Sequence, residues 1–492
     1  MPEAAGVPRL SASFAALSYD RTTVTPGIVH LGVGAFHRAH MAAYIDAILP
    51  SDPSWGIIGA SLRRPDTRAA LAPQDFLYSV AVRSAGAPRI SVVGSLLDVI
   101  DGHAEPAALL AAMADPRIRI VSMTVTEKGY CADPATGALD ENHPDIVHDL
   151  AHPETPVSVP GMIVAALQMR AAAGVAPFTV LCCDNLPANG VTVRRVVTRF
   201  AALRDPDLAA HIADKVAFPS TMVDRIVPAT TDDDRALVRD ATGFWDAWPV
   251  MTEPFSQWVV EDRFPAGRPA LETVGVQFVE DVAPYELTKL RMLNGSHSTI
   301  AYLGCLAGYP LVNQAITDPA MRDLIFGLMT DEVMPTLPPG LPDLAGYRDA
   351  LLERFANPML HHRTAQIAMD GSQKLPQRLL GTIRDRLGQE LVVERAALGV
   401  AAWMRYVTGI DEQGSPIDVK DPMAARLRAI GEAAGRDAAR LVDGMLAVAG
   451  IFGSDLPRNE PFRETLRRHL DGLFVDGAAA TVARVNARSG SR

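Results

Sequence analysis

The chain has few cysteines and no long apolar segment, and each absence removes a class of protein. Only four cysteines occur among 492 residues, which is too few for a disulfide-stabilised scaffold, so we expect a reducing compartment. No run approaches the roughly 18 apolar residues that a membrane-spanning helix needs. The first residues, MPEAAGVPRLSASF, lack the basic start and apolar core of a signal peptide. We therefore expect a soluble, cytoplasmic protein with no membrane partner.

Positive charge is also scarce, and no metal-binding pattern is evident. Lysine and arginine total 46 against 57 acidic residues, and the net charge of −11 argues against nucleic acid as the main partner. Cys182 and Cys183 are adjacent, so on a strand they would point to opposite faces, and no CxxC or spaced histidine pair accompanies them. We expect no metal, and a globular protein of two domains, because the length exceeds that of a single core.

The first strong signal is a strand, a glycine turn and a helix. Residues 27–34 read GIVHLGVG and are followed by AFHRAHMAAYIDAIL, which has helical periodicity. Gly32 and Gly34 would let a pyrophosphate approach the backbone at a helix N-terminus. The third glycine of the usual fingerprint is absent, and Phe36 and Arg38 occupy its region as further cofactor-binding candidates. An ordinary strand-to-helix turn would leave the same pattern.

A second strand at 55–62 leads to the position where a cofactor ribose would lie. Asp66 can bind ribose hydroxyls, as in enzymes that use NAD, whereas the preceding Arg63 and Arg64 can hold the 2′-phosphate of NADP. The sequence favours NAD and leaves NADP open.

Polar clusters follow several later strands. Strands are expected at about 89–94, 117–126 and 177–183. Glu127 and Lys128 follow the second of these and Asn185 follows the third, while Asp224 lies within the apolar segment 217–228. Ligands of open α/β sheets bind beyond the carboxyl ends of the strands, so these positions are candidates for cofactor or substrate contacts. The same side chains are also common in ordinary loops.

From about residue 281 the pattern becomes helical. Helices are predicted at 319–334, 345–356, 374–388, 396–408, 422–449 and 462–473. The sequence therefore predicts an α/β Rossmann-like N-terminal domain that binds NAD (1–280). A mostly α-helical C-terminal domain that carries catalytic and substrate-binding residues (281–492) follows it.

The stretch 285–304 concentrates polar side chains in apolar sequence. On a regular helix at about 100° per residue, Lys289, Asn294 and His297 fall within an arc of roughly 140°, with Glu286 inside it. A buried lysine can take a proton from an alcohol near neutral pH, while an asparagine and a histidine can donate hydrogen bonds to the oxygen that becomes negative as hydride leaves. Glu286 could tune the lysine or pass protons to water. Alternatively, Asn294-Gly295 forms a turn or kink.

Seven segments together carry a resemblance that covers essentially the whole chain. They are GIVHLGVGAFHRAH, TVTEKGYC, FTVLCCDNLPANG, FPSTMVDRIVP, EPFSQWVVEDRF, KLRMLNGSH and IAMDGSQKLP. On these motifs the chain resembles the long-chain mannitol dehydrogenase family of polyol and sugar-acid dehydrogenases. The resemblance implies an enzyme with its active site between the two domains and without a catalytic metal.

The family also implies residue roles. Its K-x4-N-x2-H motif supplies a general base and two groups that hold the reacting oxygen, which match Lys289, Asn294 and His297. The glutamate before the lysine, here Glu286, is implied to gate proton exchange. The resemblance places three further residues in the substrate or catalytic pocket or its surroundings: Asn185, Asp224 and Lys374.

Three positions bear on the substrate. Lys128, Arg291 and Gln366 match the family members that interconvert D-mannonate and D-fructuronate, rather than those that act on mannitol. A sugar-acid carboxylate needs a cation, and Lys128 or Arg291 can supply one. The segment 246–255, DAWPVMTEPF, instead resembles the mannitol enzymes. We expect a small sugar acid as substrate, with mannitol and fructose as the alternative.

Overall fold

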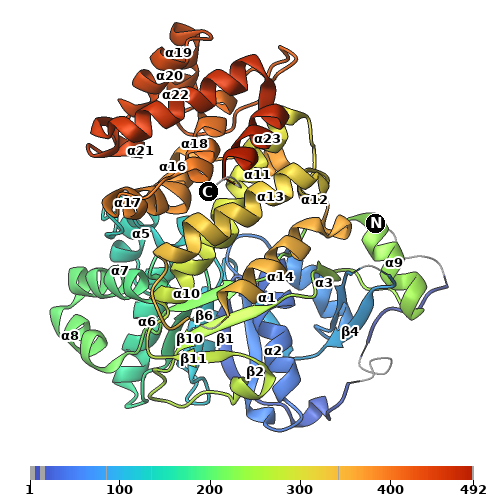
Figure 1. Ribbon diagram of the computed structural model, residues 1–492. Coiled ribbons are helices and arrows are strands. Elements are labelled where there is room, and N and C mark those ends of the chain that lie inside the picture. Colours follow the sequence, from blue (N-terminus) through green and yellow to red (C-terminus); the bar gives the residue numbers. More distant parts are fainter. Residues whose placement is uncertain (1–5, 12–16, 85, 134–135, 342, 490–492) are drawn as a thin grey trace. The chain divides into compact units, whose positions relative to one another are not determined.

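The computed structural model describes residues 6–11, 17–84, 86–133, 136–341 and 343–489 (Figure 1). The chain divides into two compact units, Met1–Ala283 and Pro284–Arg492, which we call unit 1 and unit 2. Among the described residues, none of the helices combines the length and the apolar character needed to cross a bilayer.

Unit 1 is organised around a five-stranded, fully parallel sheet in the order β5-β2-β1-β6-β7. Its strands are β1 (Pro26–Leu31), β2 (Gly56–Ser61), β5 (Leu96–Asp101), β6 (Ile120–Met123) and β7 (Thr179–Cys182). From β1 the chain adds β2 and β5 on one side of this strand, and then adds β6 and β7 on its other side. The sheet therefore has a topological switch point beside the carboxyl end of β1, where doubly wound sheets bind their ligands.

Alternate residues of the parallel sheet enter two separate hydrophobic cores. Ile28 of β1 and Ile120 of β6 belong to the core that includes α2 (Met41–Ile48). Their neighbours Val29 and Val121 belong to the core that includes α4, α6 and α7. Because successive strand residues point to opposite faces, helices cover both faces of the sheet, as Figure 1 shows for α2 and α6. This confirms the predicted Rossmann-like fold.

The remaining elements of unit 1 surround this sheet. Its other helices are α1 (Ala35–Ala39), α3 (Asp66–Leu71), α4 (Pro106–Ala114), α5 (Pro144–Ala151), α6 (Val159–Ala172), α7 (Asn189–Arg204), α8 (Pro206–Lys215) and α9 (Asp232–Thr242). Two three-stranded sheets are formed by β11 (Gln277–Val279), β10 (Gln257–Glu261) and β8 (Thr221–Asp224), and by β4 (Arg89–Val93), β3 (Tyr78–Val82) and β9 (Val250–Thr252).

The strand predicted at 89–94 is confirmed, but it does not belong to the parallel sheet. The segment expected as a strand at 89–94 is β4, but it pairs antiparallel with β3 outside the parallel sheet. The strand that completes that edge is β5, LLDVID, which the sequence reading did not identify. Both segments have strand-like patterns, and only the pairing distinguishes them.

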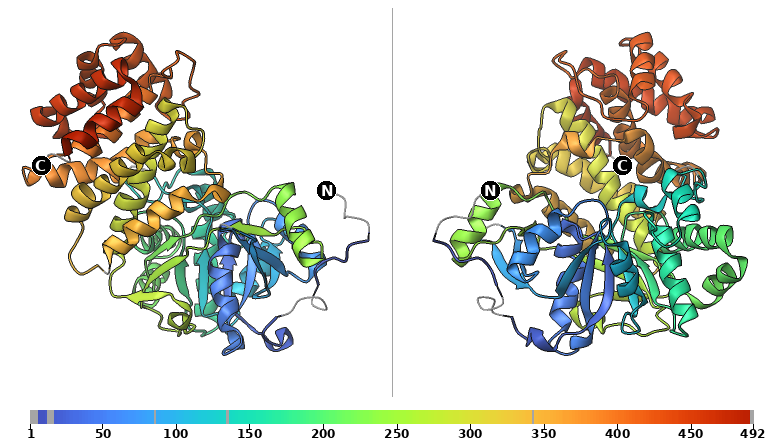
Figure 2. Two further views of the ribbon diagram at one scale, coloured as in Figure 1. Left: turned by 45° about the vertical axis from the view of Figure 1, so that its right-hand side comes forward. Right: turned by 180° about the vertical axis from the view of Figure 1, so that it is seen from behind.

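The described part of unit 2 is built from helices (Figure 2). They include α10 (Ala283–Thr288, whose first residue precedes the boundary), α11 (Gly295–Ala307), α12 (Val312–Thr317), α13 (Pro319–Gly327), α14 (Leu344–Ala356), α15 (Thr364–Ile367), α16 (Gly371–Leu375), α17 (Gly381–Gly388), α18 (Glu394–Tyr406), α19 (Ala424–Ala434), α20 (Ala438–Leu446), α21 (Ala449–Phe452), α22 (Glu460–Val475) and α23 (Gly477–Ser489). The buried helix α11 packs against α18 within one hydrophobic core. The single helix predicted at 422–449 is interrupted at Gly435, where φ is +60°, between α19 and α20.

Candidate active site

A cavity of about 570 Å³ lies in unit 1 beyond the carboxyl ends of β1, β2 and β6. It is lined by both glycines of the turn after β1, Gly32 and Gly34. Gly32 has φ +90° and its backbone packs against the Thr124 carbonyl, so a Cβ there would clash. A Cβ on Gly34 would meet nothing within 4 Å and would enter the cavity. The turn therefore offers the close backbone approach that a dinucleotide pyrophosphate requires.

Neither Phe36 nor Arg38 is among the residues that line this cavity. The Phe36 ring stacks on His40 with centroids 4.9 Å apart. Arg38 is buried, donates a hydrogen bond to the Trp248 carbonyl and lies 5.3 Å from the centre of the Tyr78 ring. Helix α1 thus buries Arg38 but leaves Phe36 partly exposed, and the cofactor role expected for both residues stays a prediction.

Residues at and after the end of β2 also line the cavity. Asp66 begins α3 as an exposed residue and does not line the cavity, whereas Ser61 and Arg63 do. A hydroxyl and a guanidinium thus line the cavity after β2. The contact of Asp66 with a cofactor ribose stays a prediction.

Asp184, which the sequence did not predict as a site residue, holds the loop after β6. Asp184 accepts hydrogen bonds from the backbone N–H groups of Val125 (2.9 Å) and Thr126 (3.1 Å) and from the Tyr130 hydroxyl (2.6 Å). Burial raises the pKa of its carboxyl group. Glu127 and Lys128, both exposed, lie in the loop segment that these bonds fix.

Asn185 and Asp224 lie near the ends of β7 and β8. Asn185 follows Asp184 directly, and Asp224, which is buried, is the last residue of β8. The neighbouring Asn189 ties the two strands together, because its amide nitrogen donates to the carbonyls of Cys182 (3.2 Å) and Thr221 (3.0 Å). Asn189 thus joins the end of β7 to the start of β8, and Asp224 lies at the opposite end of β8.

The predicted catalytic stretch of unit 2 is helical but not regular. Between α10 and α11, Lys289–Asn294 form a π-helical turn, closed by a hydrogen bond from the Gly295 N–H to the Leu290 carbonyl. In an α-helix Lys289 and Asn294 would be about 140° apart, whereas the i to i+5 bonding of a π-turn brings residues five apart nearly into line. Gly295 has helical dihedral angles (φ −64°, ψ −47°), so Asn294-Gly295 is not a turn. The wider helical turn brings Lys289 and Asn294 towards one face.

His297 is the buried member of this group. Glu286, Lys289 and Asn294 are partly exposed, whereas only 7% of His297 is exposed. Its Nε2 has no hydrogen-bond partner among the residues that the structure describes. Burial lowers the pKa of His297 well below its usual range, and nearby cationic groups lower it further. The imidazole is therefore neutral near pH 7, with a ring nitrogen available to a ligand.

Two neighbours of His297 were not selected from the sequence. The His362 ring, which comes from a loop, lies 5.2 Å from the His297 ring at 88°. The Arg378 guanidinium donates to Ser298 Oγ (3.1 Å), one residue beyond His297. Both come from segments distant in sequence, and no motif reading of 285–304 could have found them.

Arg291 and Arg378 have different surroundings. Arg291 is buried, forms an ion pair with Asp385 (2.6 Å) and donates to Thr336 Oγ1 (2.8 Å), which favours a structural role instead of the predicted substrate contact. Arg378 is half-buried and has no acidic partner among the described residues. One helical turn earlier, Lys374 donates to the Met369 carbonyl (2.6 Å) and lies 3.9 Å from Asp370.

A Rossmann unit with an open glycine turn, joined to a helical unit that groups lysine, asparagine and histidine, defines the class of nucleotide-dependent dehydrogenases. Two family models match almost the whole chain. The mannitol dehydrogenase Rossmann domain matches residues 26–273 and the mannitol dehydrogenase C-terminal domain matches 281–474. The chain belongs to the mannitol dehydrogenase family, which confirms the predicted resemblance, and it is an oxidoreductase that acts on CH–OH groups.

Individual relatives cover the chain almost completely. A D-mannonate oxidoreductase of Escherichia coli is 47% identical over 95% of this chain and 97% of its own. A mannitol 2-dehydrogenase of Cereibacter sphaeroides is 42% identical over 95% of this chain and 98% of its own. The mannitol 2-dehydrogenase of Pseudomonas fluorescens, solved as a ternary complex with NAD and D-mannitol, has a TM-score of 0.85 and 39% identity, covering 98% of this chain and 100% of that one.

Proposed function

We propose that this enzyme transfers hydride between NAD and a secondary alcohol of an open-chain sugar acid, interconverting D-mannonate and D-fructuronate. The observation that carries the dehydrogenase part is the grouping of Lys289, Asn294 and neutral His297 on one helical segment with a π-turn. The relative that acts on mannonate, at 47% identity, supports the sugar-acid part.

The cavity after β1 fits the cofactor. The open side of Gly34 leaves room for a pyrophosphate beside free backbone N–H groups, and Ser61 would face the ribose. The solved relative with bound NAD supports the choice of that cofactor. When bound, the nicotinamide supplies the hydride acceptor for alcohol oxidation. Arg63 at the cavity wall makes a comparison of NADH with NADPH part of the test.

The residues of unit 2 would remove the alcohol proton and stabilise the negative charge that develops on the oxygen. Lys289 removes the proton from the alcohol oxygen, which is general base catalysis. Asn294 and neutral His297 donate hydrogen bonds to that oxygen as it becomes negative, which stabilises the charge without a competing proton transfer. Glu286, three residues before Lys289, passes the proton towards solvent. Lys289 replaces a metal ion as the means of ionising the alcohol.

A sugar-acid carboxylate is bound well by a cationic side chain. Arg378 has a half-buried guanidinium without an acidic partner in the described chain, and it lies beside the helix that carries His297. Charge-assisted hydrogen bonds from arginine to carboxylate are among the stronger polar contacts. We assign the carboxylate to Arg378 of unit 2, where Lys374 would bind a hydroxyl group. The substrate contacts of Lys128, Asn185 and Asp224 in unit 1 stay predictions.

A side-by-side kinetic comparison tests this proposal. We would measure NADH oxidation near pH 7 with D-fructuronate and with D-fructose, and repeat the better reaction with NADPH. A preference for fructuronate of about a hundredfold in kcat/KM, equivalent to about 2.7 kcal/mol, is expected if a carboxylate anchor operates. A preference for fructose would replace this proposal with a mannitol 2-dehydrogenase activity, which the relative from Cereibacter sphaeroides makes the second candidate.

A further inference from the structure

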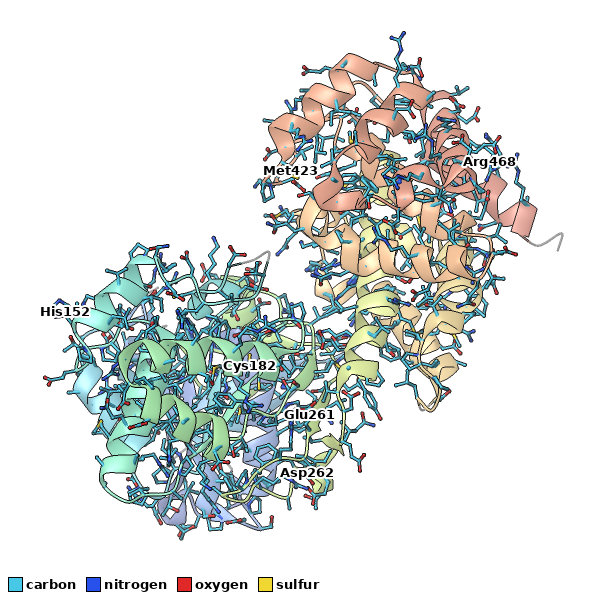
Figure 3. All side chains as sticks on the ribbon, turned by 90° about the vertical axis from the view of Figure 1, so that its left-hand side faces the viewer. His152, Cys182, Glu261, Asp262, Met423 and Arg468 are labelled. Atoms are coloured by element: carbon cyan, nitrogen blue, oxygen red, sulfur yellow. The ribbon has the colours of Figure 1, made fainter. Side chains whose placement is uncertain are left out.

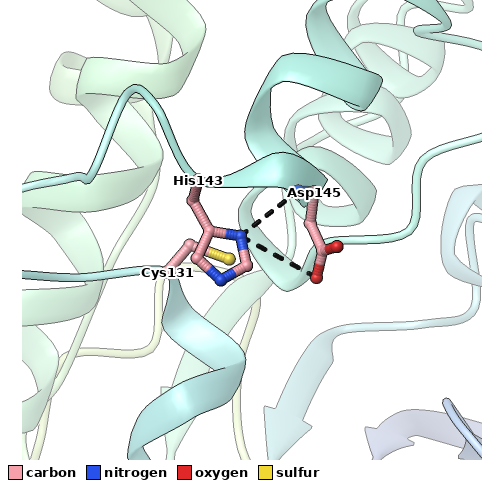
Figure 4. Close-up of side chains that lie close together, drawn as sticks. All are labelled: Cys131, His143 and Asp145. Carbon is pink, nitrogen blue, oxygen red and sulfur yellow. Dashed lines mark hydrogen bonds and ion pairs between the residues drawn. The ribbon is translucent and has the colours of Figure 1, made fainter.

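Three potential metal ligands meet in unit 1, outside the residues assigned to catalysis. The ligand atoms of Cys131, His143 and Asp145 all lie within 4.8 Å of one another, and the side chains point towards each other (Figure 4). Cys131 follows the 3₁₀ turn Glu127–Tyr130, whereas His143 caps α5 and Asp145 lies in its first turn. The sequence reading found no cysteine–histidine set because the ligands come from two segments that only the fold brings together.

The chemistry of the three ligands matches zinc. Thiolate, imidazole and carboxylate are the ligand types that zinc takes, at about 2.0–2.3 Å from each donor atom. Nδ1 of His143 lies 4.0 Å from Asp145 Oδ2, and its lone pair points towards Asp145, where it accepts a weak hydrogen bond from the backbone N–H (3.2 Å). A closing movement of about 1 Å would bring all three donors to coordination distance. Water would complete a tetrahedral site.

The electrostatic field at this cluster also favours a divalent cation. The carboxylates of Asp145, Asp149 and Asp140 act electrostatically on the Cys131 sulfur, and this negative charge would attract a cation. Metal binding would replace the thiol proton, so one proton leaves Cys131 as the metal–sulfur bond forms.

The cluster adjoins the nucleotide cavity. Asp145 lines that cavity together with Gly129, which lies two residues before Cys131. An ion held by Cys131 and Asp145 would tie the loop after β6 to the start of α5 at the cavity wall.

We propose that Cys131, His143 and Asp145 form a binding site for one zinc ion, which joins the loop after β6 to α5 beside the nucleotide cavity. The site is distinct from the proposed catalytic residues and does not depend on the identity of the substrate.

Calorimetric titration of Zn²⁺ into the metal-free, full-length protein tests the site. We expect one ion per chain with a dissociation constant of about 1 μM or lower, and a heat that depends on the buffer because a proton is released. Cys131→Ser and Asp145→Asn should each weaken binding by about tenfold or more. Asp145 is 45% exposed in its side chain, so its substitution provides a variant that is expected to fold even if Cys131→Ser does not.

An exposed histidine pair on the same helix supplies the matched control. The rings of His148 and His152 lie 5.0 Å apart and could bind zinc by themselves. His148→Gln should leave the titration unchanged. Substitution of Zn²⁺ by Co²⁺ should add a thiolate-to-cobalt charge-transfer absorption that is absent from Cys131→Ser. Binding that is lost in His148→Gln, binding that is retained in Asp145→Asn, or a cobalt complex without that absorption would each overturn the proposal.

Discussion

The side chain of His297 is neutral near pH 7, and this limits the part it can take in catalysis. Its pKa lies well below the usual range because the ring is buried next to cationic groups. A neutral imidazole can donate one hydrogen bond to the reacting oxygen, but its low pKa means that it binds an additional proton weakly and is a poor general base. Proton removal is therefore left to another group, and Lys289 is the candidate on the same helical segment.

Replacement of Lys289 by alanine tests this division of roles. We expect kcat to fall by about 10²–10⁴, the range of general base catalysis, because Lys289 is the proposed general base for the alcohol. NADH affinity, measured by fluorescence titration, should stay within about threefold, because the proposed cofactor contacts lie in unit 1. Equal losses of turnover and NADH binding would instead indicate structural damage.

Replacement of Arg378 by methionine tests the carboxylate anchor. Loss of a hydrogen bond to a charged group costs about 1.5–3 kcal/mol, so KM for D-fructuronate should rise by roughly 10- to 150-fold. KM for D-fructose should change little, because that sugar has no carboxylate. Arg384→Met is the matched control, since Arg384 is bound to Asp455 (2.6 Å), and neither KM should change. An equal rise in KM for both sugars in Arg378→Met would show that Arg378 does not bind the carboxylate.

At the level of secondary structure, α11 depends on a close approach to the chain around Arg378. A Cβ on Gly295 would lie 2.7 Å from the Arg378 carbonyl oxygen, so only glycine lets the two backbones meet there. Gly295 is also the residue that ends the π-turn Lys289–Asn294. The Asn-Gly pair thus serves helix packing, although its sequence signal suggested a turn.

Gly295→Ala should therefore destabilise unit 2 in spite of the higher helix propensity of alanine. Overpacking of this kind costs about 1–3 kcal/mol, which thermal denaturation followed by circular dichroism would detect. Gly304→Ala in the same helix is the control, because the nearest atom to its Cβ would be the Thr364 methyl group at 3.1 Å, and the nearest backbone atom, the Tyr309 carbonyl oxygen, would lie at 3.7 Å. A loss as large in Gly304→Ala would refute the special role of Gly295.

For the molecule as a whole, buried histidines predict a loss of stability in mild acid. His469 packs against the start of α18, bonded to the Glu394 carbonyl (3.0 Å), and burial lowers its pKa to about 4. Between its usual value near 6.5 and 4, the unfolded chain binds more protons than the folded chain, so stability falls as the pH falls. The contribution of His469 between pH 7 and pH 5 is about 2 kcal/mol.

His469→Gln removes this titration while keeping a side-chain donor for the Glu394 carbonyl. We expect the difference in stability between pH 7 and pH 5 to shrink by about 2 kcal/mol, as measured by urea denaturation at both values. His211→Gln is a suitable control, because the partly exposed ring of His211 lies on the separate helix α8 of unit 1. An unchanged pH difference in His469→Gln would show that His469 does not couple folding to protonation.

The buried side chains of unit 1 show which features sequence motifs can predict and which they cannot. Figure 3 shows Cys182 inside this unit. Cys182 and Cys183 are buried and form no disulfide. Asp184, which follows them, accepts a hydrogen bond from Tyr130 and holds the loop after β6. The glycine turn, the parallel sheet and the cluster 286–297 could all be found from the sequence. Each depends on local order along the chain, such as strand periodicity, a special φ or a fixed spacing on one helix.

What the sequence by itself determined is the family, the two fold classes and the grouping of Lys289, Asn294 and His297, because these follow from residues near one another in the chain. Only the tertiary structure separated Arg378, with no acidic partner in the described chain, from Arg291, which Asp385 neutralises. It alone brought Cys131 to His143 and moved Arg38 into the interior. The physical reason is that burial and charge pairing depend on contacts with segments distant in sequence, and a local sequence pattern does not determine which distant segment packs against it.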